Sequence, residues 1–306
     1  MAAAVERRSA QRPLRRPRVG ERVLEPLHPP LKLGRDMGAA VAHLLREMTI
    51  ETRRMVRSLA GSPQAEAETL QVLSPPQVLS AMDAPADTPY MGRSVPDEAQ
   101  RRLDALLSRY KRKFEQLADT WSRRMISGVM ETSTAQLSIG LKDMAERMEI
   151  HATIAEPRVR AVVEASTRSC VQLITRIPEQ YLGEVQVQVM SAITTGSGLD
   201  KLVPYLTRRY EDDARHAHLV ALDQIRKATA NVNAARLQAI GVEEYVWIHT
   251  GGERYPRKLH QSYSGRVFRY DDPPVIDERT GEVGKPGDAY FCRCQMRPVL
   301  KFTKAA

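Results

Sequence analysis

The stretch Tyr245-Val246-Trp247-Ile248-His249-Thr250, followed closely by Gly265-Arg266-Val267-Phe268, decides the fold of the C-terminal part of the chain. Large side chains alternate along the first stretch, which is typical of a half-buried strand, and the end of the second predicts another strand. Turns follow at Asp271-Asp272-Pro273-Pro274 and at residues 284–288, because proline fixes φ and glycine reaches positive φ. These features predict a small α+β module over residues 239–306, with Trp247, Phe268 and Val299 in its core.

The chain before this module reads mainly as helices. Apolar residues recur at three- and four-residue spacing over residues 37–60 and through a long region, residues 98–238. Within that region the pattern predicts a break near Gly128–Thr134, a new helix starting at Pro178, and a further break between a short helix at 199–206 and a long one from residue 212. The predicted fold class is mainly α with a small C-terminal α+β module and an extended N-terminal arm.

Two segments lack the composition of packed structure. Residues 1–36 are rich in arginine and proline, and residues 61–97 are rich in proline, alanine and serine. Such segments bury little apolar surface, so the first is predicted to be a basic flexible arm and the second a linker, both gaining order only on a partner. The arm is expected to dock on an acidic protein surface or on DNA phosphates, and the alternative is a solubilising tail.

The overall charge of the chain also favours an acidic protein surface or nucleic acid as a partner. The 306 residues carry a net charge of +9 and a pI of about 9.6, which favours nucleic acid or an acidic protein surface as a neighbour, although many basic soluble proteins bind neither. A helix with an apolar stripe between residues 103 and 125 has basic residues on its other positions. It is expected to pack in a core, and the alternative is a nucleic-acid or membrane surface.

The three cysteines do not form a disulfide framework, which indicates a reducing compartment. No apolar run is long enough for a transmembrane helix, and the N-terminus lacks the apolar stretch of a secretory signal, so no membrane partner is expected.

One group of residues has the chemistry of a metal site. His260, Cys292 and Cys294 offer an imidazole and two thiols, the ligands that zinc prefers. In an extended Cys-x-Cys segment both thiols share one face, so both can bind one ion, and His249 or Asp288 could supply a fourth ligand. The alternative is two packed cysteines beside a histidine that bonds the backbone. No cofactor other than this structural zinc is predicted.

Catalytic motifs are absent from the sequence: it has no P-loop, no nucleophile elbow and no paired-histidine metalloprotease helix. His260 with Arg257 and the acids Asp271 and Asp272 could imitate a nuclease site, with the histidine as general base. An Asp-Asp-Pro-Pro sequence is far more often a turn than a metal site. The chain is therefore predicted not to be an enzyme.

The order of these elements resembles the C-terminal module of the phage head-morphogenesis family, the Mu F-like minor head proteins, over residues of about 155–301. The preceding helix is also similar to the family's, through Ala221–Gln224, Asn233 and Arg236. The residues that carry the resemblance in the module are Trp247, Arg257, His260, Gly265, Phe268, Asp271, Asp272, Pro273, Pro286, Gly287, Cys292, Arg293, Cys294, Pro298 and Val299.

The resemblance implies a minor head (capsid) protein of the virion, associated with the portal vertex and acting in head morphogenesis and in DNA packaging or ejection. Its expected partners are the portal protein, the inner surface of the major capsid protein and packaged DNA. Its expected location is the head interior or the portal vertex, after assembly in the host cytoplasm. The alternative is a DNA-binding accessory protein or a nuclease of a mobile element.

Overall fold

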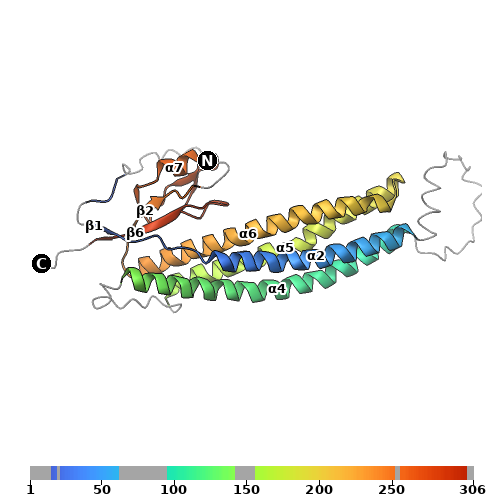
Figure 1. Cartoon of the computed structure of the whole chain (residues 1–306), viewed down its shortest axis with the longest axis horizontal. Helices are drawn as coiled ribbons and strands as arrows, with labels where there is room; N and C mark the ends of the chain where they lie inside the picture. Colours follow the sequence, from blue (N-terminus) through green and yellow to red (C-terminus); the bar gives the residue numbers. More distant parts are fainter. Residues whose placement is uncertain (1–14, 19–20, 62–94, 142–155, 252–255, 302–306) are drawn as a thin grey trace, which may run out of the picture. The chain divides into compact units, whose positions relative to one another are not determined.

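The structure is a computed structural model, and it describes residues 15–18, 21–61, 95–141, 156–251 and 256–301 (Figure 1). The helices are α2 (Leu31–Ala60), α4 (Val95–Gly140), α5 (Pro157–Thr195), the 3-10 turn η2 (Leu199–Lys201), α6 (Leu202–Ala239) and α7 (Lys258–Ser262). The strands are β1 (Glu21–Val23), β2 (Glu244–Ile248), β3 (Val267–Arg269), β4 (Val275–Asp277), β5 (Glu282–Val283) and β6 (Gln295–Lys301). The predicted fold class, mainly α with a small C-terminal α+β module, is confirmed.

The chain divides into two compact units whose boundaries fall inside the four long helices. The helical unit consists of Ala39–Thr120 and Val171–His218, and the C-terminal unit consists of Met1–Gly38, Trp121–Cys170 and Leu219–Ala306. Because the sequence signals of the module lie in the C-terminal unit, that unit holds the candidate site.

Segments of α2, α4, α5 and α6 pack together in the helical unit. Tyr110 and Phe114 of α4 are fully buried in its core, which confirms that this basic helix packs rather than presenting a free apolar face. The Tyr110 hydroxyl donates to a Glu51 carboxylate of α2 at 2.9 Å, and Lys111 pairs with Glu179 of α5 at 3.0 Å. Acids of the neighbouring helices thus pair with part of the basic face of α4. None of the described helices is both long enough and apolar enough to cross a membrane.

Two helices begin earlier than the sequence predicts. α2 begins at Leu31 rather than at residue 37, and α4 begins at Val95 rather than at residue 98. Pro30 precedes α2, and proline suits a helix start because its fixed φ is helical and no backbone donor is needed there. Gly34 then allows the first turns of α2 to approach α6, since a Cβ at Gly34 would lie 3.2 Å from the Cα of Leu222.

The predicted break near Gly128–Thr134 is wrong, because α4 continues through it. Glycine is here a packing residue rather than a helix stop: a Cβ at Gly128 would lie 2.8 Å from the Cδ2 atom of Leu33. The side chain of Leu33 therefore occupies the space that a larger residue would need, and the helical backbone is kept.

The breaks at Pro178 and near residue 206 are also wrong. Pro178 lies inside α5, and α6 runs without interruption from Leu202 to Ala239. An interior proline removes one backbone hydrogen bond and costs about 3 kcal/mol. Burial of Ile174 and Tyr181, one turn to either side of Pro178, holds the helix together across it.

The C-terminal module contains an antiparallel sheet with the strand order β1-β6-β2-β3 and a separate ribbon of β4 and β5. Trp247 of β2 lies opposite Met296 of β6, and Tyr245 lies opposite Phe268 of β3. Trp247, Tyr245 and Phe268 are buried on one face with residues from the ends of α4 and α6. Val299 is buried as predicted, but it lies in a second, smaller cluster with Val246 and Val267.

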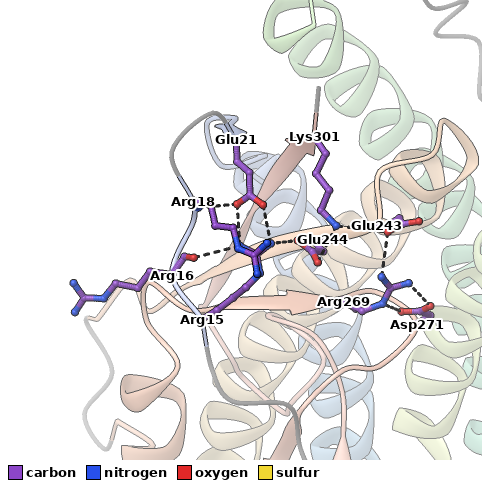
Figure 2. A network of polar contacts seen from close by, with 9 residues as sticks. All are labelled: Arg15, Arg16, Arg18, Glu21, Glu243, Glu244, Arg269, Asp271 and Lys301. Atoms are coloured by element: carbon purple, nitrogen blue, oxygen red, sulfur yellow. Dashed lines mark hydrogen bonds and ion pairs between the residues drawn. The ribbon is translucent and has the colours of Figure 1, made fainter. Parts of the chain in front are cut away.

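The N-terminal segment is part of this module, which corrects the prediction of a flexible arm through residue 36. β1 pairs with β6, Leu24 is buried in the main core, and the Arg15 carbonyl accepts a hydrogen bond from the Val267 backbone N–H at 2.8 Å. Figure 2 shows the Arg15 guanidinium between the carboxylates of Glu21 and Glu244. The pairing of β1 with the edge of the sheet and the ion pairs of Arg15 thus order this N-terminal segment, although its composition predicts an unstructured chain. Residues 1–14 and 62–94, including most of the predicted linker, lie outside the described residues.

Candidate metal centre

The structure brings the three predicted metal ligands together. His260 lies on α7, while Cys292 and Cys294 lie in the extended segment that leads into β6. All three are buried, with exposed fractions of 1%, 0% and 6%, and their ligand atoms lie within 4.8 Å of one another. The Nδ1 atom of His260 is 3.5 Å from the Sγ atom of Cys292 and 3.7 Å from that of Cys294. Arg293 between the two cysteines is exposed, so both thiols share one face, as the Cys-x-Cys spacing predicts.

A second histidine touches the cluster from the end of β2. The Nδ1 atom of His249 lies 3.5 Å from the Sγ atom of Cys294. Two hydrogen bonds fix the backbone here: the His249 N–H donates to the Ser264 hydroxyl at 3.2 Å, and the Thr250 hydroxyl donates to the Arg293 carbonyl at 2.8 Å. Because Thr250 is joined to the segment that carries the cysteines, His249 is held beside Cys294.

The hydrogen bonds of His260 define which of its nitrogens faces the thiols. Its Nε2 atom lies 3.0 Å from the backbone carbonyl of Ile276, which can only accept, so Nε2 carries a proton and Nδ1 points to the cysteines. Burial acts to lower the pKa of His260, but the hydrogen bond and negative charge of Cys292 outweigh it and raise the pKa. Hydrogen bonds from Cys294, His260 and the Gly287 backbone lower the pKa of Cys292 against the effect of burial, which favours its thiolate.

The segment that leads to the cysteines is attached to one stripe of α6. Asp223, Lys227 and Asn231 lie four residues apart and therefore share a helix face. The segment runs antiparallel to the helix along this face. The Phe291 N–H donates to the Asp223 carboxylate at 2.9 Å, and the Lys227 Nζ atom lies 5.3 Å from the centroid of the Tyr290 ring. The Asn231 side-chain amide donates to the Asp288 carboxylate at 3.0 Å. Lys227 also pairs with Asp223 at 2.9 Å. The helix thereby fixes the loop that carries the thiols.

The remaining residues of the resemblance have structural contacts. Arg257 donates a hydrogen bond to the Tyr290 carbonyl at 2.9 Å, and Gly265 has a φ of 79°, a conformation that favours glycine. Asp271 accepts two hydrogen bonds from Arg269, both at 2.8 Å, and Asp272 is exposed beside the half-buried Pro273. The Asp-Asp-Pro-Pro sequence is thus a turn fixed by an ion pair.

This arrangement argues against the nuclease interpretation. A general base has to reach the proton that it removes. His260 is buried, one of its nitrogens bonds a backbone carbonyl, and the other faces two thiols. Asp271 is engaged by Arg269. The described residues therefore place no general base beside an available carboxylate at this position.

Sequence reasoning found the cysteines and His260 but did not assign the contacts of α6. Arg236 is 5% exposed and donates to the hydroxyls of Ser133 at 2.8 Å and Thr134 at 3.0 Å on α4. A buried arginine late in an amphipathic helix is a signal that could have pointed to this contact, because charged residues on a core face require partners. The partner itself is not readable from the chain.

The fold and the site define a protein of long helices that carries a small α+β module with a buried cluster of cysteine and histidine. Residues 183–297 match the family described as Phage Mu protein F like protein, which confirms the resemblance for that segment. An uncharacterized protein of Haemophilus influenzae is 33% identical over 144 residues, which are 47% of this chain and 31% of that relative. The chain thus spans about a third of the length of that relative. No solved structure matches the chain.

Proposed function

We propose that this protein is a minor head protein of a phage virion, associated with the portal vertex and acting in head morphogenesis and in DNA packaging or ejection. The observation that carries the proposal is the match of residues 183–297 to the Mu F-like family. The matched segment includes α6 with Asp223, Lys227 and Asn231, which hold the loop before the cysteines. It also includes strands β2 and β3 and the buried cluster of histidine and cysteines. The matched segment therefore contains the buried cluster and the helix that holds its loop, while β1 and most of β6 lie outside it.

The contacts of the module support a structural rather than a catalytic role. Its histidine and cysteines are buried, and Asp271 of its central turn is engaged by Arg269. The expected partners are the portal protein, the inner surface of the major capsid protein and packaged DNA. The net charge of +9 favours a position close to DNA. The same charge would suit the alternative, a DNA-binding accessory protein, and the experiment below distinguishes the two.

The proposal is tested in a phage that encodes this chain. We expect quantitative mass spectrometry of purified heads to find the protein in few copies, protected from protease until the heads are opened. Deletion of the gene should reduce the yield of filled heads, and a plasmid copy should restore it. Absence of the protein from purified heads, with a normal yield of infectious particles, would overturn the proposal. Association with free phage DNA but not with heads would favour the accessory protein.

A truncation that tests docking by the N-terminus has to leave the folded part of the N-terminal segment in place, so it cannot remove the whole of residues 1–36. Deletion of residues 1–36 would remove β1, the buried Leu24 and the first turn of α2. Deletion of residues 1–14 leaves all three in place. If the extreme N-terminus docks on the portal or capsid, the shorter deletion should abolish incorporation into heads while the purified protein melts as before. Incorporation at the normal copy number would show that residues 1–14 are only a solubilising tail.

A further inference from the structure

We propose that His249, His260, Cys292 and Cys294 bind one Zn²⁺ ion in a closed structural site of the C-terminal module. This inference does not depend on the proposed function. It rests on the closeness of His260, Cys292 and Cys294, on the contact of His249 with Cys294, and on the contacts that orient these side chains.

Three nitrogen–sulfur distances in the cluster match those of a tetrahedral zinc site, and His249 joins the group through its contact with Cys294. With a Zn–S bond of about 2.3 Å, a Zn–N bond of about 2.0 Å and a tetrahedral angle, a sulfur and a nitrogen on one ion lie about 3.5 Å apart. The three contacts between imidazole nitrogens and thiol sulfurs in the cluster are 3.5, 3.5 and 3.7 Å.

The orientation of His260 is that of a metal ligand. The Ile276 carbonyl holds the proton on Nε2, so in the neutral imidazole the lone pair lies on Nδ1, toward Cys292 and Cys294. Histidines that bind metals usually donate their other N–H to a carbonyl or carboxylate, which fixes both the tautomer and the ring. The Trp247 and His260 rings pack edge to face, with ring centroids 5.1 Å apart, which restricts the imidazole further.

The structure also selects between the two candidates for the fourth ligand. Both carboxylate oxygens of Asp288 are engaged, one by Asn231 at 3.0 Å and the other by the backbone and the side chain of Lys285 at 2.8 and 3.1 Å. His249 instead directs Nδ1 at the Cys294 sulfur. It is only partly buried, so it would close the solvent side of a site whose other ligands are buried.

Two thiolates and two imidazoles in a tetrahedron favour zinc over the harder cations, and four protein ligands make the site structural rather than catalytic. The ion would join three segments that are distant in sequence: the end of β2, α7, and the loop before β6. Short strands and a five-residue helix form this part of the module, so such a cross-link would stabilise it. Cys294, Thr250 and Arg293 also line a cavity of about 310 Å³, so one ligand of the site borders this cavity.

The first test is the metal content of the full chain, purified without chelator and measured by elemental analysis. We expect about one equivalent of zinc per chain and its loss in Cys292→Ala and His260→Ala. The matched controls are Cys170→Ala, which removes the buried cysteine of α5, and His216→Ala, which removes an exposed histidine of α6. Both should retain the full equivalent. Less than a tenth of an equivalent in the unmodified chain would overturn the proposal, as would equal loss in the controls.

Variants of the site can lose zinc simply because they unfold, so a second measurement uses the intact ligands. In a Trp121→Phe background, Trp247 is the remaining tryptophan of the chain and lies against His260. After removal of zinc by chelator, added Co²⁺ should produce thiolate charge-transfer absorption and quench Trp247 fluorescence at one equivalent. Added Zn²⁺ should reverse both changes. Absence of either signal from chelated protein that is still folded would contradict the site.

The assignment of His249 has its own test, which is competition for Zn²⁺ with a chromophoric chelator. Since loss of an outer-shell partner already weakens metal binding about 10- to 100-fold, His249→Ala should weaken it by at least about 100-fold. Asp288→Asn, the matched control, keeps an oxygen acceptor for Asn231 and should weaken binding much less than His249→Ala, because Asp288 holds the loop but does not bind the ion. Unchanged affinity in His249→Ala would remove His249 from the site, and a large loss in Asp288→Asn would transfer the fourth position to Asp288.

Discussion

The Asp223 carboxylate of α6 accepts a hydrogen bond from the backbone N–H of Phe291 at 2.9 Å, and Phe291 directly precedes Cys292. Phe291 has a φ of 55° and is the one non-glycine residue with positive φ in the described part of the chain. That conformation costs about 1–2 kcal/mol for an ordinary L-residue, so the surrounding contacts have to hold it. Asp223 is 1% exposed and provides one of these contacts.

Replacement of Asp223 should therefore destabilise the C-terminal unit. Asp223→Ala leaves the Phe291 N–H and Lys227 without their partner and is expected to cost about 1–3 kcal/mol of unfolding free energy. Asp223→Asn keeps an acceptor for Phe291 and should cost less. Urea unfolding followed by circular dichroism measures both, and Asp212→Ala on the exposed side of α6 is the control, expected within about 0.5 kcal/mol of the unmodified chain. Equal effects at positions 223 and 212 would contradict the role of Asp223.

The attachment of β1 should depend on pH through Glu21. The hydrogen bond from Arg15 is the largest of the interactions that lower the pKa of Glu21 below its usual 4.5, against the effect of burial. A carboxylate with a lowered folded-state pKa contributes its stability fully above the unfolded value and loses it as the pH falls through the folded value.

Glu21→Gln should accordingly be less stable than the unmodified chain by about 1 kcal/mol at pH 7, and the difference should shrink as the pH falls below 4.5 and vanish below the folded-state pKa of Glu21. Urea titrations of both proteins between pH 7 and pH 3 measure this. Glu115→Gln, at an exposed position of α4, serves as the control and should show a small difference at every pH. A difference at position 21 that grows on acidification would have the wrong sign for this ion pair.

Arg236 and Ser133 are expected to be energetically coupled, because the Arg236 guanidinium donates to the Ser133 hydroxyl at 2.8 Å in the buried contact between α6 and α4. Arg236→Ala should cost about 2–3 kcal/mol, and Arg236→Lys should recover little, since one ammonium does not reproduce the several donors of the guanidinium. A double-mutant cycle with Ser133→Ala should give a coupling of about 0.5–3 kcal/mol. Strict additivity in that cycle would show that this hydrogen bond contributes nothing.

Trp247 should be the main apolar contribution of β2 to the module, since its side chain is fully buried among His260, Tyr263 and Phe268. Trp247→Ala is expected to cost about 3–5 kcal/mol. In the Trp121→Phe background the emission of Trp247 should be blue-shifted in the folded protein and should move to the red on unfolding. Red-shifted emission from the folded chain would contradict the buried position.

Two glycines in helices should respond in opposite ways to alanine. Gly183 in α5 is exposed, and a Cβ added there would have no atom within 4 Å beyond its own helix backbone and chain neighbours, so Gly183→Ala should stabilise the helix by about 0.5–1 kcal/mol. Gly34→Ala should not, because its Cβ would lie 3.2 Å from the backbone of Leu222 and 3.1 Å from two side-chain atoms of α6. Thermal melting of the two variants compares them directly. Stabilisation at Gly34 would show that the contact between α2 and α6 yields easily.

Features that depend on local pattern can be read from the amino-acid sequence alone. Alternation around Trp247 identifies β2, spacing of apolar residues identifies the helices, and the Cys-x-Cys spacing places Cys292 and Cys294 on one face. Each follows from a period of two or 3.6 residues, which a short window of sequence already contains. The succession of turns and aromatic residues also sufficed for the resemblance that the family match bears out over residues 183–297.

Tertiary packing determines where local signals are overruled and which distant residues meet. Pro178 and Gly128 mark helix ends by propensity, yet both lie inside helices because burial of neighbouring side chains, or close contact with Leu33, outweighs the local preference. The arginine-rich N-terminal segment is ordered because the edge of β6 and the carboxylate of Glu244 are available to it. The choice of His249 over Asp288 beside the thiols has the same origin, since it depends on which groups the folded chain has already engaged.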